Sequence, residues 1–242
     1  MKILDFFQRG YVINLPERTD RRKGAAAELN KLGLSFTPGK LELFAAIRPT
    51  ETGGFPSIGA HGCFLSHLQI LKQARAEGLA NVLIMEDDLF INRAFKEVEA
   101  SVVEQLSQQE WDMVYFGDST DRPVIFPVQF NRLNHDILTT TFYGVNASVY
   151  DQFIHFLETL KSRPSGHPDG GPMHLDGAYN VFRCQNPEVI ALQTNGGLVA
   201  QRSSRSDIYP NAWYENMPML RPAVELVRKG KMLVRSRRAS LR

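Results

Sequence analysis

The chain of 242 residues is 43% hydrophobic and 22% charged, with a formal net charge of +2, which is the composition of a soluble globular protein. This length accommodates one large domain or two small ones with a sizeable core. No run approaches the roughly 18 to 20 apolar residues of a membrane-spanning helix, and the N-terminus lacks the apolar segment and cleavage site of a secretory signal.

The net charge conceals a segregation along the sequence. Residues 221–242 carry eight basic side chains and one acid, which leaves 20 basic and 25 acidic residues in the rest of the chain. A nucleic-acid-binding protein usually carries its positive charge on the folded face, so we expect no nucleic-acid partner. Apolar residues interrupt the basic ones, and we therefore expect the tail either to lie on an anionic membrane surface or to be a disordered solubilising extension.

Cysteine usage bears on the compartment. Cys63 and Cys184 are the two cysteines and lie far apart, which suits a reducing cytosol better than a disulfide scaffold. Together with the absence of a signal, this predicts a cytoplasmic protein, peripheral on the inner face of the cytoplasmic membrane where the basic tail binds lipid.

Apolar runs alternate with helical patterns, which indicates an α/β fold with a mainly parallel central sheet. In chain order we predict a strand at 11–15, a helix from Thr19 or Asp20 to Gly33, a strand at 42–47, a loop at 49–59, a helix at 63–77, a strand at 82–85, a helix at 92–107 and a strand at 112–116. We then predict a strand at 138–145, a helix at 150–161, a loop at 162–172, a helix at 175–182 and a strand at 188–192. No linker separates two cores, so we expect one domain over 1–215, with a nucleotide-binding half to about 120, an acceptor half over 121–215, and a basic tail over 216–242.

Three adjacent carboxylates follow the buried strand predicted at 82–85. Glu86, Asp87 and Asp88 would repel one another at a strand end, and a divalent cation carrying a diphosphate would remove that cost through hard oxygen ligands. Because side chains alternate along an extended chain, Glu86 and Asp88 are expected on the same side. The pattern predicts a metal clamp with Glu86 and Asp88 as ligands; the alternative is a solvated acidic turn.

Polar and cationic residues follow the first predicted strand. Ligands bind at the carboxyl ends of strands in open α/β sheets, and arginine gives planar bidentate contacts to phosphates. Asn14, Arg18 and Arg21 are therefore candidates for contacts to a nucleotide, with a solvated helix start as the alternative. Neither a glycine-rich dinucleotide fingerprint nor a P-loop follows this strand, which disfavours dinucleotide, methyltransferase and NTPase functions.

The predicted helix at 63–77 begins with a glycine-rich segment. Gly59 and Gly62 allow the backbone to approach a ligand, and free amides at a helix N-terminus suit an anion. Ser66 and His67 are predicted to fall near the first turn and are candidate binding residues. The alternatives are a structural histidine and, for Cys63, simple packing.

Several carboxylates could remove a proton from a sugar hydroxyl. Asp176 follows a flexible loop and begins a predicted helix, where it could act as a general base or simply cap the helix. Asp112 and Asp118, which bracket another predicted strand, are competing candidates. Near the C-terminus, Arg202 and Arg205 lie on a polar loop that could close over a phosphate.

Taken in order, these pieces resemble glycosyltransferase family 25, the group of lipooligosaccharide-biosynthesis proteins and collagen galactosyltransferases. The matching blocks, within roughly residues 10–210, are Val12-Ile13-Asn14-Leu15 with Arg18, Asp20 and Arg21; Gly59 through Gly62-Cys63 to Ser66-His67; Val82 through Ile84-Met85 to Glu86-Asp87-Asp88; and Ser206-Asp207-Ile208. The resemblance implies a GT-A-like nucleotide-sugar-binding fold and an inverting transfer from a UDP-sugar, most often UDP-galactose. It also implies a divalent cation, Mn²⁺ or Mg²⁺, and a glycan acceptor such as lipooligosaccharide or another lipid-linked saccharide.

Carried over position by position, the resemblance assigns roles within the site. Glu86 and Asp88 match the metal-binding acids, with Asp88 as the direct ligand that also supports departure of the diphosphate. Asp176 sits where many members place an acid, and we take it as the catalytic base. The residues assigned to the donor are Asn14, Leu15, Arg18, Arg21, Ser66, His67, Asp87 and, from the polar loop, Arg205.

Two other functional classes remain open from the sequence. A metal-dependent phosphoryl hydrolase would use the same acidic triplet, although the first strand lacks the usual nucleophilic aspartate at its end. A non-catalytic carbohydrate- or nucleotide-sugar-binding module would keep the fold without turnover.

Overall fold

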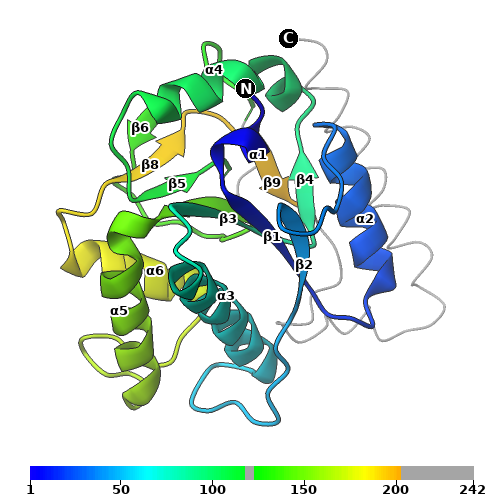
Figure 1. Cartoon of the computed structure of the whole chain (residues 1–242). Coiled ribbons are helices and arrows are strands. Elements are labelled where there is room, and N and C mark those ends of the chain that lie inside the picture. The colour runs from blue at the N-terminus through cyan, green and yellow to red at the C-terminus, as the bar shows by residue number, and fades with distance from the viewer. Residues whose placement is uncertain (118–122, 203–242) are drawn as a thin grey trace.

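A computed structural model describes residues 1–117 and 123–202 of the chain. In this part, a central sheet lies between two groups of helices, which gives three layers (Figure 1). The predicted tail at 216–242, the loop residue Arg205, the block at 206–208 and Asp118 lie outside the described residues.

The central sheet confirms the predicted fold class. The described strands pair in the order β2-β1-β3-β7-β5-β8-β6, and a separate pair is formed by β4 and β9. Their bounds are β1 Arg9–Asn14, β2 Leu41–Ala45, β3 Asn81–Glu86, β4 Leu89–Ile91, β5 Met113–Tyr115, β6 Phe130–Arg132, β7 Phe142–Asn146, β8 Ala191–Thr194 and β9 Val199–Gln201. Strands β2, β1, β3, β5 and β8 run in one direction and β7 and β6 in the other, so the sheet is mixed but mainly parallel.

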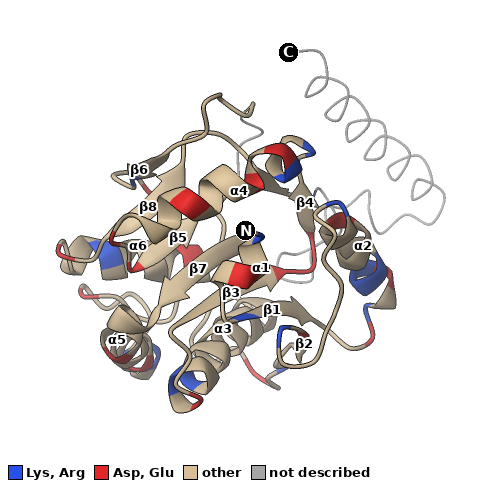
Figure 2. Cartoon of the chain, turned by 45° about the horizontal axis from the view of Figure 1, so that its top comes forward, with Lys and Arg blue, Asp and Glu red and all other residues tan. Residues whose placement is uncertain are grey.

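Helices cover both faces of this sheet. Their bounds are α1 Ile3–Phe6, α2 Thr19–Asn30, α3 Ile58–Ala76, α4 Ala94–Ser107, α5 Tyr150–Ser162 and α6 Leu175–Gln185, with a 3₁₀ turn at Ala147–Val149. Helices α3, α5 and α6 pack on one face, and α1, α2 and α4 pack on the other (Figure 1). Charged residues lie mainly on helices and loops, whereas the central strands carry few of them (Figure 2). Among the described residues, no helix is both long and apolar enough to cross a bilayer.

Strand β3 shows how the sequence builds the two cores. Val82 and Ile84 belong to the core under α3, α5 and α6, while Leu83 and Met85 belong to the core under α2 and α4. All four side chains are fully buried, because a strand in the middle of a sheet with helices on both sides has no solvent-facing side. The alternation continues to the end of the strand and directs the polar residues found there.

Two helix starts differ from the prediction. Helix α3 begins at Ile58 rather than Cys63, because the Ser57 hydroxyl accepts a hydrogen bond from the backbone NH of Ala60 and caps the helix. Gly62 therefore lies inside the helix, where its missing side chain lets Ile47 approach: an added Cβ would lie 2.5 Å from the Ile47 carbonyl oxygen. Helix α2 begins at Thr19 with Arg18, not Thr19 or Asp20, in the N-cap position.

Candidate active site

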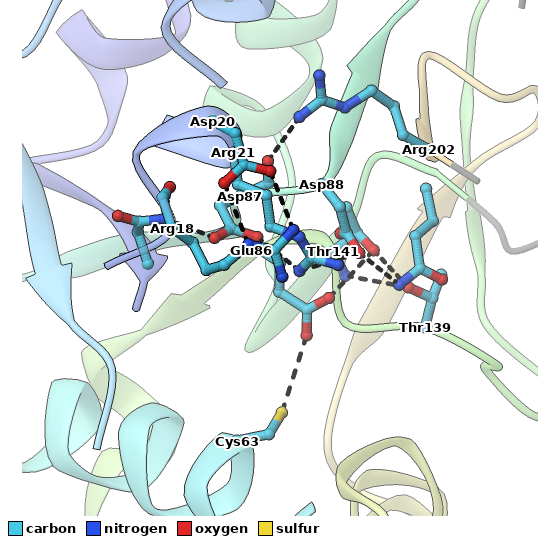
Figure 3. Close-up of polar contacts among 12 residues, drawn as sticks. Arg18, Asp20, Arg21, Cys63, Glu86, Asp87, Asp88, Thr139, Thr141 and Arg202 are labelled. Atoms are coloured by element: carbon cyan, nitrogen blue, oxygen red, sulfur yellow. Dashed lines mark hydrogen bonds and ion pairs between the residues drawn. The ribbon is translucent and has the colours of Figure 1, made fainter. Parts of the chain in front are cut away.

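The acidic triplet lies at the carboxyl end of β3, beside the carboxyl end of β1 (Figure 3). Glu86 ends the strand, and residues 87 and 88 form the turn into β4. Alternation sends Glu86 toward α3 and Asp87 toward α2. The expectation that Asp88 lies on the same side as Glu86 requires an extended chain. The chain instead turns after Glu86, so a metal site shared by Glu86 and Asp88 stays a prediction.

Glu86 is held by residues of α3 and of the segment that leads into β7. Its Oε1 accepts a hydrogen bond from Thr140 Oγ1 at 3.1 Å and lies 3.5 Å from His67 Nε2, while Oε2 lies 3.5 Å from Thr141 Oγ1. Burial acts to raise the pKa of Glu86, but the electrostatic interaction with His67 and the hydrogen bond from Thr140 outweigh it, and the pKa is lowered. Glu86 is therefore a carboxylate at neutral pH.

Asp87 ties the strand end to β1 and α2. Its Oδ1 pairs with Arg21 at 3.0 Å, and its Oδ2 accepts a hydrogen bond from Asn14 Nδ2 at 2.6 Å. Burial raises the pKa of Asp87 above its ordinary value, although Arg21 and Asn14 act in the opposite direction. Asp87, Arg21 and Asn14, which the sequence assigned to donor binding, thus contact one another and hold the turn in place.

We expect Asp87→Ala to lower the free energy of unfolding by about 2–3 kcal/mol, because it removes charge-assisted hydrogen bonds from a buried carboxylate. Asp20→Ala is the matched control, since it breaks the pair between Asp20 and Arg18 on an exposed part of α2 and should cost less than about 1 kcal/mol. Urea unfolding of both variants measures the difference. Equal losses would show that Asp87 is not an anchor.

Asp88 is the least compensated carboxylate of the triplet. Its Oδ2 accepts a hydrogen bond from Gln201 Nε2 at 3.1 Å and lies 4.0 Å from Arg21, whereas its Oδ1 is buried without a hydrogen-bond partner among the described residues. Burial and then the charge of Glu86 raise the pKa of Asp88 to about 7. A buried carboxylate oxygen that lacks a donor fits a hard divalent cation, which takes oxygen ligands and compensates their charge.

The cation-free protein should lose stability as the pH rises from about 4 to about 7. The folded chain holds a proton on Asp88 up to a pKa of about 7, against an ordinary value of 3.8, so unfolding releases this proton in that window and becomes easier with rising pH. The shift corresponds to up to about 4 kcal/mol. Urea unfolding in EDTA across this range should show the slope in the wild type and a flatter profile in Asp88→Asn. A slope of equal size in the variant would assign the effect to other groups.

Arg202, which directly follows β9, lies beside the acidic turn. The backbone NH of Arg202 donates to the Asp88 carbonyl at 2.6 Å, and its guanidinium donates to the Asp87 carbonyl at 2.8 Å. This guanidinium packs against Gly24 of α2, where an added Cβ would lie 2.4 Å from an Arg202 nitrogen. Arg202 is thus fixed beside the acidic turn, as Figure 3 shows.

A small pocket opens beside these carboxylates. Its walls include Thr141 and Gln201, which contact Glu86 and Asp88. Tyr115 also lines this pocket, and its hydroxyl is buried with no hydrogen-bond partner in the described part of the chain. The pocket therefore offers polar groups to a ligand next to the acidic turn.

The remaining donor-side residues are engaged within the protein. Arg18 forms a bidentate pair with Asp20 at 3.1 Å, which lowers the pKa of Asp20, and Leu15 is half-buried with its carbonyl accepting the Arg18 NH. The Ser66 hydroxyl donates to the Gly62 carbonyl at 2.7 Å and accepts the Ile47 NH at 2.8 Å. Ser66 therefore fastens α3 to the segment after β2, two turns into the helix rather than near its start.

The candidate bases separate clearly in space. Asp176 lies in the first turn of α6, is half-buried, and is close enough for its charge to raise the pKa of the Cys63 thiol, after the larger effects of burial and Glu86. The cap position of α6 is occupied by His174, so Asp176 is not the N-cap that the sequence left as an alternative. Asp112 precedes β5 and accepts hydrogen bonds from Ser148 and Ile190, at the edge of the sheet opposite the acidic turn.

Thr140, Thr141 and Tyr143 were not predicted from the sequence to belong to the site. These residues lie about 55 positions after Glu86. Because β7 pairs antiparallel with β3, Thr140 and Thr141 reach Glu86 and Tyr143 reaches His67. The only local signal in the sequence for this part of the site was that hydroxyl-bearing residues precede strand β7. Their role follows from the insertion of β7 beside β3, which no spacing in the sequence encodes.

Proteins with an open α/β sheet bind ligands at the carboxyl ends of the strands. This chain has such a sheet, with carboxylates and arginines at the carboxyl ends of β1 and β3, and so belongs to that class of proteins. The sequence model described as "Glycosyltransferase family 25 (LPS biosynthesis protein)" matches residues 7–129, which is just over half of the chain. The chain belongs to this family. The family and the α/β fold class with a mainly parallel central sheet, both predicted from the sequence, are thereby confirmed.

Relatives of this chain carry different descriptions. The "Inactive glycosyltransferase 25 family member 3" of Homo sapiens is 28% identical over 142 residues, which cover 48% of this chain and 23% of that protein. "Procollagen galactosyltransferase 1" of Danio rerio is 27% identical over 136 residues, covering 46% of this chain and 21% of that protein. The matches thus span less than a quarter of these relatives. A crystal structure of a glycosyltransferase involved in glycosylation of the major capsid of PBCV-1 has a TM-score of 0.49 at 11% identity, covering 82% of this chain and 93% of that one.

Proposed function

We propose that this protein is a metal-dependent glycosyltransferase that moves a sugar from a nucleotide-sugar donor to a hydroxyl group of a glycan acceptor. The observation that carries the proposal is Asp88, a buried carboxylate with one oxygen lacking a donor, in a turn beside Glu86 and next to a pocket lined in part by Thr141 and Gln201. The family to which the chain belongs supports the reaction class. A phosphoryl hydrolase has no comparable support.

The family supports a finer proposal for the donor and the acceptor. We propose UDP-galactose as the donor, which agrees with the description of the procollagen galactosyltransferases among the relatives. For the acceptor we propose a lipid-linked saccharide such as lipooligosaccharide, in agreement with the description of the family as an LPS biosynthesis protein. Mn²⁺ is the expected cation, with Mg²⁺ as the substitute.

In this mechanism, the residues of the site have distinct tasks. Asp88 and Glu86 would hold the cation, which would supply positive charge against the negative charge that grows on the departing diphosphate. Asp176 takes the proton of the acceptor hydroxyl while its oxygen forms a bond to the anomeric carbon. The bond from that carbon to the diphosphate oxygen breaks on the opposite face, so the configuration inverts and UDP leaves.

Cationic side chains complete the donor side. Arg202 is fixed against the acidic turn by its bonds to two backbone carbonyls. Arg21 is anchored by Asp87 and lies 4.0 Å from Asp88. We propose that these guanidinium groups, together with Arg205 from the segment that follows, balance the diphosphate as its negative charge increases.

Release of UDP tests the proposal directly. The full chain is incubated with a panel of UDP-sugars and Mn²⁺, with and without glycan acceptors, and both UDP and glycosylated product are measured. Transfer, or slow hydrolysis of one UDP-sugar, supports the proposal. Release of phosphate from simple esters without cleavage of any UDP-sugar would assign the site to a hydrolase instead.

A non-catalytic binding module is the second candidate, because several relatives of this chain are described as inactive or probably inactive members of the family. Such a module would bind a UDP-sugar without cleaving it. Calorimetric binding of a UDP-sugar in the presence of Mn²⁺, combined with no UDP release over the full acceptor panel, would favour the module over the enzyme.

The basic tail supports a proposal for location. We propose that residues 221–242, with eight basic side chains, place the protein on the inner face of the cytoplasmic membrane, where a lipid-linked acceptor would lie. We expect the full chain to sediment with anionic liposomes and the 1–220 fragment to remain in solution at about physiological ionic strength. Equal sedimentation of both would remove the tail as a membrane anchor.

A further inference from the structure

Beneath the acidic turn, three side chains capable of binding a metal point toward one another. Cys63 Sγ, His67 Nε2 and a carboxylate oxygen of Glu86 all lie within 4.8 Å of one another. Cys63 and His67 are separated by one turn of α3 and therefore share a face of the helix, while Glu86 approaches from the end of β3. Of this cluster, the mechanism proposed above uses only Glu86.

One distance within the cluster matches the spacing of ligands around a tetrahedral ion. Zn²⁺ binds sulfur at about 2.3 Å and imidazole nitrogen or carboxylate oxygen at about 2.0–2.1 Å, which places neighbouring ligand atoms about 3.3–3.6 Å apart. Glu86 Oε1 lies 3.5 Å from His67 Nε2 and 3.9 Å from Cys63 Sγ. The first distance is longer than an ordinary N–H···O hydrogen bond and matches an edge of such a tetrahedron.

His67 is prepared for this role by its neighbours. The residue is fully buried, its Nδ1 lies 2.7 Å from the Tyr143 hydroxyl, and that hydroxyl lies 2.7 Å from the Tyr179 hydroxyl. With Nδ1 engaged in this way, Nε2 points at Glu86 and lacks a hydrogen-bond partner within the described ranges. Metal-binding histidines commonly use their other nitrogen in such an outer contact, which fixes the ring.

The charge around the cluster also favours a cation. The carboxylates of Asp176 and Asp88 act on the Cys63 thiol in addition to that of Glu86. Thr140 donates a hydrogen bond to the Glu86 oxygen that faces His67 and so orients it. Three protein ligands would leave the fourth position of the ion for water or a substrate group.

We propose that Cys63, His67 and Glu86 form a binding site for a thiophilic divalent cation, of the class of Zn²⁺ or Co²⁺. The thiol gives up its proton to solvent when the sulfur–metal bond forms, and no electron is transferred. The site shares Glu86 with the donor-cation site proposed above but differs from it in using sulfur and nitrogen, which soft and borderline cations prefer over Mn²⁺ or Mg²⁺.

Cobalt gives a readout that is specific for sulfur. Co²⁺ is titrated into the metal-free full chain, and we expect the near-ultraviolet absorption band of a thiolate–cobalt bond, lost on addition of Zn²⁺ because Zn²⁺ displaces cobalt. Cys63→Ser should lose the band. Cys184→Ser, which changes the exposed second cysteine, should keep it. A band that is absent from the wild type, or that persists in Cys63→Ser, would overturn the proposal.

A second measurement covers the case in which Cys63→Ser does not fold. Zn²⁺ should slow alkylation of Cys63 several-fold in the wild type and leave Cys184 unchanged, as peptide mass spectrometry can show; equal rates with and without Zn²⁺ would contradict the site. Asp88→Asn separates this inference from the proposed function, because it should keep the cobalt band while losing Mn²⁺-dependent UDP binding. Loss of the band in Asp88→Asn would show that the two cations share one site, and it would overturn the proposal of a separate site.

Discussion

Asp88→Asn is expected to lose on the order of 10²-fold or more in the rate of sugar transfer, together with Mn²⁺-dependent binding of UDP. The substitution keeps the size of the side chain and an oxygen that can accept the hydrogen bond from Gln201, but it removes the negative charge from the oxygen that lacks a donor. Removing one well-placed group that stabilises the transition state commonly costs about 3 kcal/mol, which is on the order of 10²-fold in rate. Steady-state transfer assays and calorimetry with UDP and Mn²⁺ measure the two effects.

The control for Asp88→Asn is Asp151→Asn, which removes a carboxylate of α5 that pairs with Arg75 and is 90% exposed at its side chain. It should leave both transfer and UDP binding unchanged. Folding of Asp88→Asn is not at risk, because the neutral amide relieves the burial of a charge in the cation-free protein. Unchanged turnover in Asp88→Asn would show that the acidic turn does not hold the cation.

The end of β3 was predictable because its causes are local. An apolar run that enters a set of carboxylates predicts a buried strand that ends at a polar edge, and the structure places β3 and the triplet there. Alternation also accounts for the opposite directions of Glu86 and Asp87. It does not extend to Asp88, because alternation holds only while the chain is extended and residues 87 and 88 form a turn.

The supporting residues were not predictable because their causes are distant along the chain. Glu86 meets Thr140 and Thr141 only because β7 is inserted antiparallel between β3 and β5, which is a property of the whole sheet. The short strands β4 and β9 were missed for a similar reason: each has three residues, and each is stabilised by the other across 108 positions, Ile91 with Val199. Hydrophobic periodicity does not report pairings of this kind.

The roles assigned to the donor-side residues remain predictions. Asn14, Arg21 and Asp87 meet at the carboxyl ends of β1 and β3, as the sequence indicated. In the structure they satisfy one another, because a buried carboxylate and a buried amide need partners whether or not a ligand is present. Residue type and position could therefore predict the location of this cluster without separating anchoring from binding.

Asp176→Asn is expected to keep donor binding and to lose transfer, again on the order of 10²-fold or more. An amide cannot take the proton of the acceptor hydroxyl, so the step that Asp176 performs is removed. The donor side is formed by β1, α2 and the turn after β3, whereas Asp176 belongs to α6, so UDP and Mn²⁺ should bind as in the wild type. Loss of a negative charge in the first turn of α6 should cost at most about 1 kcal/mol, which leaves the helix folded.

The measurements for Asp176→Asn are UDP binding, transfer and thermal unfolding, with Asp169→Asn as the control. Asp169 lies in the loop just before α6 and is exposed, so its substitution should change none of the three. Loss of both binding and transfer in Asp176→Asn, or a large fall in stability, would make Asp176 a structural residue. Full transfer in a folded Asp176→Asn would place the base elsewhere. Because Asp112 lies at the opposite edge of the sheet, Asp118 would then be the next carboxylate to substitute.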